Sequence, residues 1–122
     1  MKGKAILIAI IALAAPGHAQ AHAALIKSAP GNRSVLTEAP KTINLCFNEA
    51  VELKFSKILL EDPKGDAVPL GALEAGEPNC LKATIPALGS GLFTVHYHVL
   101  SRDGHIVDYG YQFTIKPDAK TQ

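Results

Sequence analysis

Apolar and polar residues alternate along most of the chain that follows residue 21. The clearest alternation runs from Gly91 to Leu100, and its period of two is typical of a strand with one buried face. Turns rich in proline, glycine and asparagine separate similar segments, and no long helical pattern interrupts them. The predicted strands are His22–Ser28, Thr42–Phe47, Lys57–Glu61, Cys80–Ile85, Gly91–Leu100 and Tyr109–Ile115, with a minor strand near Ala67–Leu70. About seven short strands predict an all-β fold, a Greek-key β-sandwich or barrel of the immunoglobulin-like kind.

The first 21 residues have a different pattern. Two lysines precede an apolar run from Ala5 to Ala15, and the small-residue tripeptide Ala19-Gln20-Ala21 follows. This order is that of a secretory signal peptide, and the apolar run is shorter than the roughly 20 residues that a membrane-spanning helix needs. We therefore predict a signal peptide at residues 1–21 and one exported domain at residues 22–122, with no stable membrane insertion.

The charge balance argues against one class of partner. Without the two lysines of the predicted signal peptide, 10 basic side chains stand against 11 acidic ones. A nearly neutral domain without a basic cluster has little attraction for phosphate backbones. Nucleic acid is therefore excluded as an expected partner.

Both cysteines, Cys46 and Cys80, lie in the predicted exported domain, and disulfides persist in the compartments that exported proteins reach. Each cysteine alternates with apolar residues along its strand, so both project from the face opposite to the core. Two isolated cysteines also lack the paired Cys-x-x-Cys spacing of zinc sites. The sequence therefore predicts a disulfide between neighbouring strands of one sheet.

Cleavage after Ala21 would make His22 the first residue of the exported domain. Its free α-amine and its imidazole can then bind one metal ion together, and the ordinary pKa of the amine, near 8, makes its deprotonation easy at neutral pH. Nitrogen ligands of this kind suit copper(II), which prefers tetragonal coordination by nitrogen and oxygen. Taken alone, a histidine at this position is equally well explained by chance.

A second feature favours the metal site. Asp103 and His105 flank Gly104 directly after the clearest strand, and an extended backbone would place both side chains on the same side. The alternative is an ordinary Asp-Gly turn followed by an exposed histidine. Together with the amine and imidazole of His22, however, Asp103 and His105 complete a set of three nitrogens and one oxygen, which suits Cu(2+).

These residues occur within segments that resemble the CopC family of periplasmic copper-binding proteins. The resemblance covers essentially the whole predicted exported domain. Its segments are His22-Ala23 with Leu25 to Pro30, Ile43 to Glu49, and Val99 to His105 leading to Gly110 and Phe113.

The resemblance implies a Greek-key sandwich that binds copper(II) through His22, Asp103 and His105. It also implies copper carriage, homeostasis or resistance in the periplasm, often alongside an inner-membrane partner of the CopD type. Some family members bind copper(I) in a methionine-rich loop, whereas the single methionine here, Met1, lies in the predicted signal peptide. Because copper(I) selects soft thioether ligands, we expect a copper(II) site only.

Other ionisable residues have less specific interpretations. His96 and His98, at i and i+2 on one strand face, are suited to a metal site of their own, but we expect outward-facing polar residues or partners that orient the main site. Glu49 and Glu52 follow the strand at residues 42–47, and we expect them to be solvated charges.

Two other functions compete with copper carriage. An N-terminal histidine and a second histidine also form the copper brace of polysaccharide monooxygenases, but a short chain without tryptophan offers little room for their flat aromatic surface. No nucleophile and base occur at motif spacing either, so we predict a binding protein and not an enzyme. The third possibility is an immunoglobulin-like interaction module that binds no copper.

Overall fold

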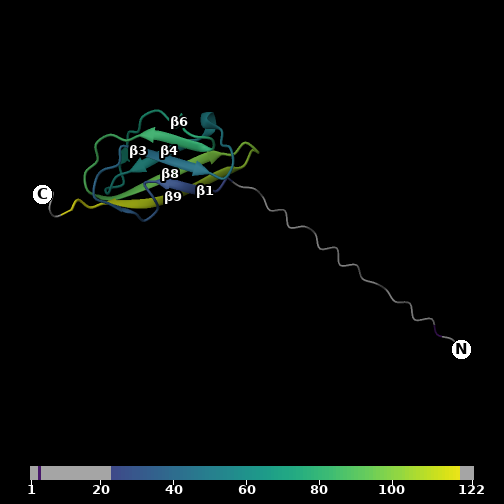
Figure 1. The fold of residues 1–122 in the computed structure, drawn as a ribbon, viewed down its shortest axis with the longest axis horizontal. Coiled ribbons are helices and arrows are strands. Elements are labelled where there is room, and N and C mark those ends of the chain that lie inside the picture. The colour runs from purple at the N-terminus through teal and green to yellow at the C-terminus, as the bar shows by residue number, and fades with distance from the viewer. Residues whose placement is uncertain (1–2, 4–22, 119–122) are drawn as a thin grey trace.

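The computed structural model describes residue 3 and residues 23–118 (Figure 1). This part of the chain contains nine strands and one short 3-10 helix. In chain order they are β1 (Leu25–Ala29), β2 (Val35–Leu36), β3 (Thr42–Phe47), η1 (Leu53–Phe55), β4 (Lys57–Glu61), β5 (Ala67–Val68), β6 (Glu74–Ala75), β7 (Cys80–Thr84), β8 (Gly91–Leu100) and β9 (Ile106–Ile115).

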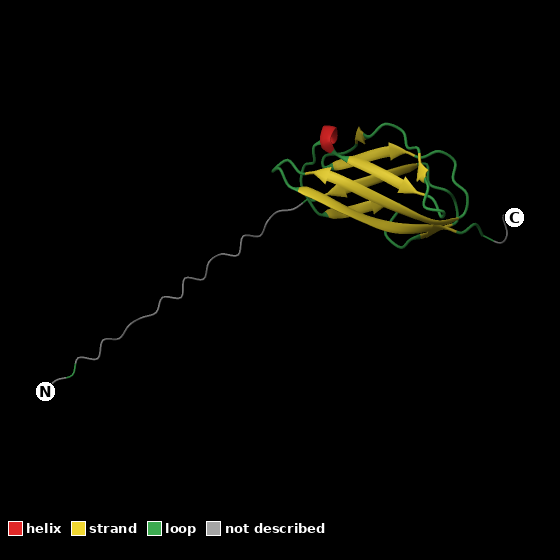
Figure 2. Cartoon of the chain, turned by 180° about the vertical axis from the view of Figure 1, so that it is seen from behind, coloured by secondary structure: helices red, strands yellow, loops and turns green. Residues whose placement is uncertain are grey.

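The strands form two sheets that lie face to face (Figure 2). The first sheet has the order β1-β3-β7-β6, and the second has the order β2-β9-β8-β4-β5. Strands that are neighbours in a sheet are antiparallel, except that β2 pairs in parallel with the end of β9. The predicted all-β sandwich is therefore confirmed.

The core fills the space between the two sheets. Alternate residues of β8 are buried, as the period of two predicts, and they pack against the buried residues of β3, β7 and β9; those of β8 are Phe93, Val95, Tyr97 and Val99. Aromatic contacts join the elements: the rings of Phe93 and Phe113 are stacked with centroids 5.5 Å apart, and Phe47 meets Tyr97 edge to face at 5.7 Å. These buried rings supply much of the apolar surface of a domain that has no tryptophan.

The predicted strands differ from the observed ones mainly at their ends. The last strand begins at Ile106 instead of Tyr109, because its pairing with β8 continues to the Leu100–Ile106 pair. Strands β2 and β6 were not predicted, since two residues are too few to show a period. The predicted first strand begins at His22, which lies outside the described residues.

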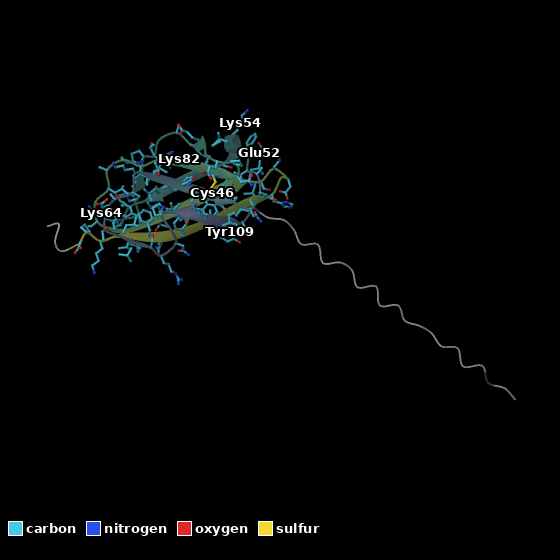
Figure 3. All side chains as sticks on the ribbon, viewed as in Figure 1. Cys46, Glu52, Lys54, Lys64, Lys82 and Tyr109 are labelled. Atoms are coloured by element: carbon cyan, nitrogen blue, oxygen red, sulfur yellow. A yellow bond between two sulfur atoms is a disulfide. The ribbon has the colours of Figure 1, made fainter. Side chains whose placement is uncertain are left out.

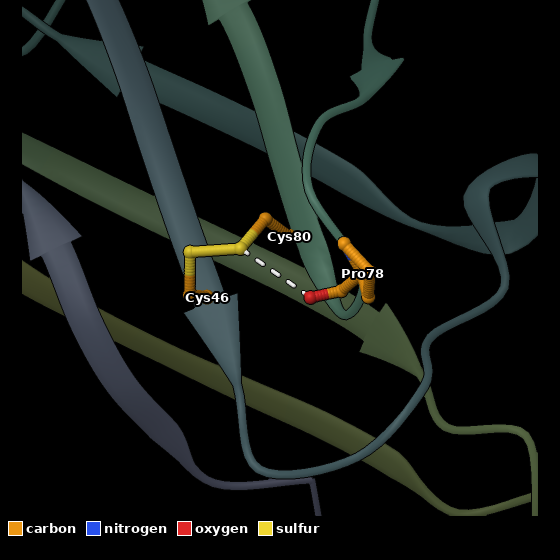
Figure 4. The surroundings of a disulfide bond; sticks show 3 residues. All are labelled: Cys46, Pro78 and Cys80. Carbon is orange, nitrogen blue, oxygen red and sulfur yellow. Dashed lines mark hydrogen bonds between the residues drawn. A yellow bond between two sulfur atoms is a disulfide. The ribbon is translucent and has the colours of Figure 1, made fainter.

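The predicted disulfide joins β3 to β7 in the first sheet. Cys46 and Cys80 are register partners, and their sulfur atoms are bonded (Figure 4). Their strand neighbours Leu45 and Leu81 are buried in the core, so the bridge lies on the outer side of the sheet, as the alternation predicts. Pro78 O contacts Cys80 Sγ at 3.7 Å.

Gly110 marks a close approach between β9 and β8. A Cβ atom at this position would lie 2.8 Å from Val95 O and 3.1 Å from His96 Nδ1. Replacement by alanine would therefore force the two backbones apart, and we expect Gly110→Ala to lower the free energy of unfolding by about 1–3 kcal/mol in urea denaturation. Gly89→Ala is the control, because a Cβ at Gly89 meets nothing within 4 Å. Equal stability of the two variants would contradict this description of the strand pair.

Candidate metal centre

The loop that joins β8 to β9 is a tight hairpin turn. Gly104 N–H donates to Ser101 O at 2.9 Å, and Ser101 N–H donates to His105 O at 2.8 Å. Gly104 has a φ of +93°, in the left-handed region that glycine enters without steric cost. The loop is therefore a three-residue hairpin connection with a left-handed third residue, and the predicted extended conformation is wrong here.

The turn nevertheless brings the two predicted side chains together. Asp103 Oδ2 lies 3.1 Å from His105 Nδ1, and the two side chains are 39% and 43% exposed. A carboxylate and an imidazole are thus in direct contact at the surface of one loop. Both side chains are partly exposed to solvent.

The buried residue Ser101 is hydrogen-bonded to both residues of this pair. Its side chain is fully buried, and its Oγ donates a hydrogen bond to Asp103 Oδ1. The same Oγ accepts a hydrogen bond from His105 N–H at 3.2 Å. The sequence pattern does not mark Ser101 as a site residue, and only its place two residues before Asp103 suggests such a role.

The hydrogen bond from Ser101 lowers the pKa of Asp103 below its ordinary value. Contacts with His105 act in the same direction, and partial desolvation opposes them. The carboxylate is therefore ionised throughout the neutral range. An ionised carboxylate is the form that binds a metal ion.

The effect of Ser101 on the pKa of Asp103 can be tested by substitution of Ser101. We expect Ser101→Ala to raise the pKa of Asp103 toward its ordinary value, because the largest stabilising contact of the carboxylate is lost. A lowered folded-state pKa contributes stability above the unfolded-state pKa, about 3.9, that is lost as pH falls through the folded-state value, so the variant loses part of this contribution. Carboxyl NMR titration measures the shift, and Ser90→Ala in an exposed loop is the control. An unchanged pKa of Asp103 would refute the role of Ser101.

The segment that follows His22 is fixed beside this loop. Ala23 is 1% exposed, and Ala24 exchanges two hydrogen bonds with Asn48: its N–H donates to Asn48 Oδ1 at 2.8 Å, and its carbonyl accepts from Asn48 N–H at 2.9 Å. Ala23 and Ala24 also line a cavity of about 440 Å³ with Ile106 to Tyr109, the first residues of β9 after His105. Ala23 and Ala24 thus lie next to the strand that leaves the hairpin loop.

Residues 48–52 join these two parts of the site. Arg102 N–H donates to Ala50 O at 3.0 Å, and Glu52 N–H donates to Leu100 O at 2.8 Å. Figure 3 shows Glu52 and Tyr109 near the same end of the sandwich, opposite to the end that carries Lys64. The N-terminal segment, residues 48–52 and the hairpin loop therefore gather at one end of the domain.

The two glutamates of this segment, Glu49 and Glu52, differ in their exposure to solvent and in their contacts. Glu52 is 3.8 Å from Arg102 in an ion pair and is 44% exposed, in agreement with a surface charge. Glu49 Oε1, however, is buried and has no hydrogen-bond partner in the described part of the chain. The expectation that Glu49 is a solvated charge therefore fails for this oxygen, because the neighbours Asn48 and Ala50 are hydrogen-bonded to the N-terminal segment and to the hairpin loop.

His22 lies outside the described residues, so the structure places two of the three predicted ligands. Among residues 23–118 no three histidine, cysteine, aspartate or glutamate side chains are arranged to hold one metal ion. His96 and His98 lie elsewhere, on the outer face of the second sheet. The described residues also form no helix of the length and hydrophobicity that crossing a membrane requires.

The fold and the loop define a small β-sandwich binding domain with a carboxylate and an imidazole at one end. The CopC domain family matches residues 25–116, and the chain belongs to this family. The predicted family is therefore confirmed. Membership also confirms the prediction that the protein is not an enzyme.

Solved structures and curated relatives agree with this assignment. CopC from Methylosinus trichosporium OB3b is 33% identical with a TM-score of 0.74, and the match covers 79% of this chain and 95% of that one. PcoC, a methionine-rich copper resistance protein from Escherichia coli, is 28% identical with a TM-score of 0.69, over 79% of this chain and 100% of that one. Protein YobA of Escherichia coli K12 is 33% identical over 79% of this chain and 80% of its own length.

The copper transport protein CutJ of Bacillus subtilis 168 has a different organisation. It is 30% identical over 90% of this chain, but the matching region is only 21% of its length. In that protein a region similar to this domain therefore belongs to a much longer chain.

Proposed function

We propose that this protein is exported to the periplasm, is processed to begin at His22, and there binds one copper(II) ion as cargo for copper homeostasis or resistance. The ligands are the amine and imidazole of His22, the carboxylate of Asp103 and the imidazole of His105. The observation that carries the proposal is the contact of 3.1 Å between Asp103 Oδ2 and His105 Nδ1.

The position of Ala23 supports His22 as the remaining ligand. Ala23 is buried, and it lines a cavity with Ile106 to Tyr109, the first residues of the strand that leaves the hairpin loop. The disulfide also fits an exported protein, because such bonds persist outside the cytosol.

The donor set favours copper(II) over copper(I). Three nitrogens and one carboxylate oxygen suit tetragonal copper(II), whereas copper(I) selects thioether and thiolate ligands. PcoC is methionine-rich, but this chain has one methionine, at position 1, and both of its cysteines form the disulfide. The proposed cargo is therefore copper(II).

A membrane transporter of the CopD type is the proposed recipient of this copper. In the copper transport protein CutJ, the region similar to this domain occupies about one fifth of the chain. A domain that is fused to a transport protein in one organism can act as a separate carrier for such a protein in another. The present chain would deliver the ion by contact at the end of the sandwich that carries Asp103 and His105.

Copper(II) titration of the exported protein tests this function. The N-terminus is first determined by mass spectrometry, and we expect it to be His22. Visible absorption and electron paramagnetic resonance should then show one tightly bound equivalent with a nitrogen-rich tetragonal spectrum. Asp103→Asn should weaken binding and change the spectrum, whereas Asp66→Asn, in the exposed turn before β5, should not. Failure to bind copper(II) in the wild-type protein would rule out the proposal.

The proposed site also predicts a dependence on pH. The amine and both imidazoles must be unprotonated to bind a metal ion, whereas the lowered pKa of Asp103 keeps the carboxylate ionised. Copper(II) affinity should therefore fall by more than about 1,000-fold between pH 7 and pH 5. Competition with a chelator of known affinity measures it. A constant affinity over this range would exclude three nitrogen ligands.

A further inference from the structure

A second group of ionisable side chains lies on the outer face of the five-stranded sheet. His96 and His98 come from β8, Glu61 from β4 and Asp108 from β9. His96 Nε2 is 3.5 Å from Glu61 Oε2, and His98 Nδ1 is 3.2 Å from Asp108 Oδ2. The histidine side chains are 46% and 42% exposed, so both rings are accessible to ions in solution.

The two histidines are suitably spaced to bind one ion. Residues at i and i+2 on a strand point to the same face, with Cα atoms about 6.8 Å apart. Two imidazoles at this spacing can lean together, since metal–nitrogen bonds are about 2.0–2.1 Å long. Gly110, the register partner of His96, has no side chain, so β9 places none against His96 Nδ1 at this position.

The carboxylates of Glu61 and Asp108 contact the two histidine rings and can orient them for metal binding. In metal sites a histidine usually gives its second ring N–H to a carboxylate, which fixes the orientation of the ring and raises the basicity of the ligand nitrogen. Asp108 contacts Nδ1 of His98 and leaves Nε2 for a metal ion, whereas Glu61 contacts Nε2 of His96 and leaves Nδ1. The same face therefore presents two imidazole nitrogens, each backed by a carboxylate.

The local charge also favours a cation. Lys57 is the register partner of His98 on β4 and carries one positive charge, against the two negative charges of Glu61 and Asp108. With neutral histidines, these five residues have a net charge of −1. The long side chain of Lys57 is exposed and can extend into solvent, away from a bound ion.

We propose that His96 and His98 form a second site for a divalent transition-metal ion, Cu²⁺ or Zn²⁺, distinct from the hairpin-loop site. Imidazole ligands suit both ions. Because no three donors converge in the described residues, the two imidazoles are the protein ligands and water completes the coordination. The Val99–Val107 and Leu100–Ile106 pairs separate this site from the loop, and it does not depend on His22.

The test uses Zn²⁺ as the probe and the exported protein with His22→Gln, Asp103→Asn and His105→Asn, so that none of the three side chains of the other proposed site can bind the ion. Nitrogen-15 NMR of the histidine rings follows the addition of zinc sulfate. We expect the ligand nitrogens of His96 and His98 to shift with saturable binding of one equivalent. Addition of His96→Gln and His98→Gln to the same protein should abolish this binding, and circular dichroism verifies the fold.

The carboxylates provide the second measurement. Glu61→Gln and Asp108→Asn should each weaken Zn²⁺ binding by about tenfold or more, as expected for groups that orient ligand histidines. Glu74→Gln, on the edge strand of the other sheet, is the matched control and should have no effect. Unchanged ring resonances in excess Zn²⁺, or equal binding without His96 and His98, would overturn this proposal and leave the hairpin-loop site unaffected.

Discussion

Replacement of both Cys46 and Cys80 with alanine is expected to lower the free energy of unfolding by about 3–4 kcal/mol. The bridge joins neighbouring strands between residues that are 34 positions apart, so it restricts the unfolded chain over about a third of the described domain. A domain of this size has a total stability of only about 5–15 kcal/mol, and the loss is therefore large.

Urea denaturation of the two proteins measures this effect. Reduced wild-type protein should be destabilised to a similar extent, which separates the loss of the bond from the effect of the alanine side chains. A difference below about 1 kcal/mol in both comparisons would show that the bridge contributes little to the stability of the fold.

Replacement of His105 with asparagine should have the second large effect. We expect copper(II) affinity to fall by more than about 100-fold, since loss of a group that only orients a ligand already costs 10–100-fold. The hairpin itself should persist in the variant, because the backbone N–H and carbonyl of His105 make the hydrogen bonds to Ser101 that close the loop. Competition titration with a chelator measures the affinity, and electron paramagnetic resonance should report one fewer nitrogen ligand.

His98→Asn is the matched control for this experiment. His98 is as exposed as His105 and also contacts a carboxylate, but it lies on the outer face of the sheet. The variant should retain the tight copper(II) site. Equal losses in the two variants would mean that copper(II) binds to surface histidines in general and not at the hairpin loop.

The strands of the core could be predicted because their burial follows a simple period. From Phe93 to Val99, apolar residues alternate with polar ones. The same alternation in their own strands predicted that Cys46 and Cys80 lie on the outer side of one sheet. Parity depends only on the pleat of a strand, so it holds wherever one face is buried. The pairing partner of each strand did not follow from this pattern.

The residues that surround the candidate ligands, Ser101 and Glu49, could not be predicted from such a period. Ser101 is important because a turn folds its Oγ under Asp103, and a turn has no period that marks its buried residue. Glu49 is held by backbone hydrogen bonds of its neighbours to segments more than 20 residues away. Such contacts arise only when distant parts of the chain meet.

Of the two alternative functions, one is excluded and the other is still to be tested. Membership of the CopC family excludes the monooxygenase interpretation, which also required an open aromatic surface. An interaction module that binds no copper has the same strands and the same disulfide, and it differs only in the chemistry of His22, Asp103 and His105. The decision between copper carriage and a metal-free module therefore depends on the terminal amine.

The most direct measurement compares copper(II) binding by the protein that begins at His22 with binding by a form that carries one additional alanine before His22. Both N-termini are verified by mass spectrometry, and electron paramagnetic resonance follows each titration. We expect one tight, nitrogen-rich tetragonal site in the first form and its loss or marked weakening in the second, because the extension removes the amine from the histidine chelate. Identical affinity and spectra in the two forms would contradict the proposed site.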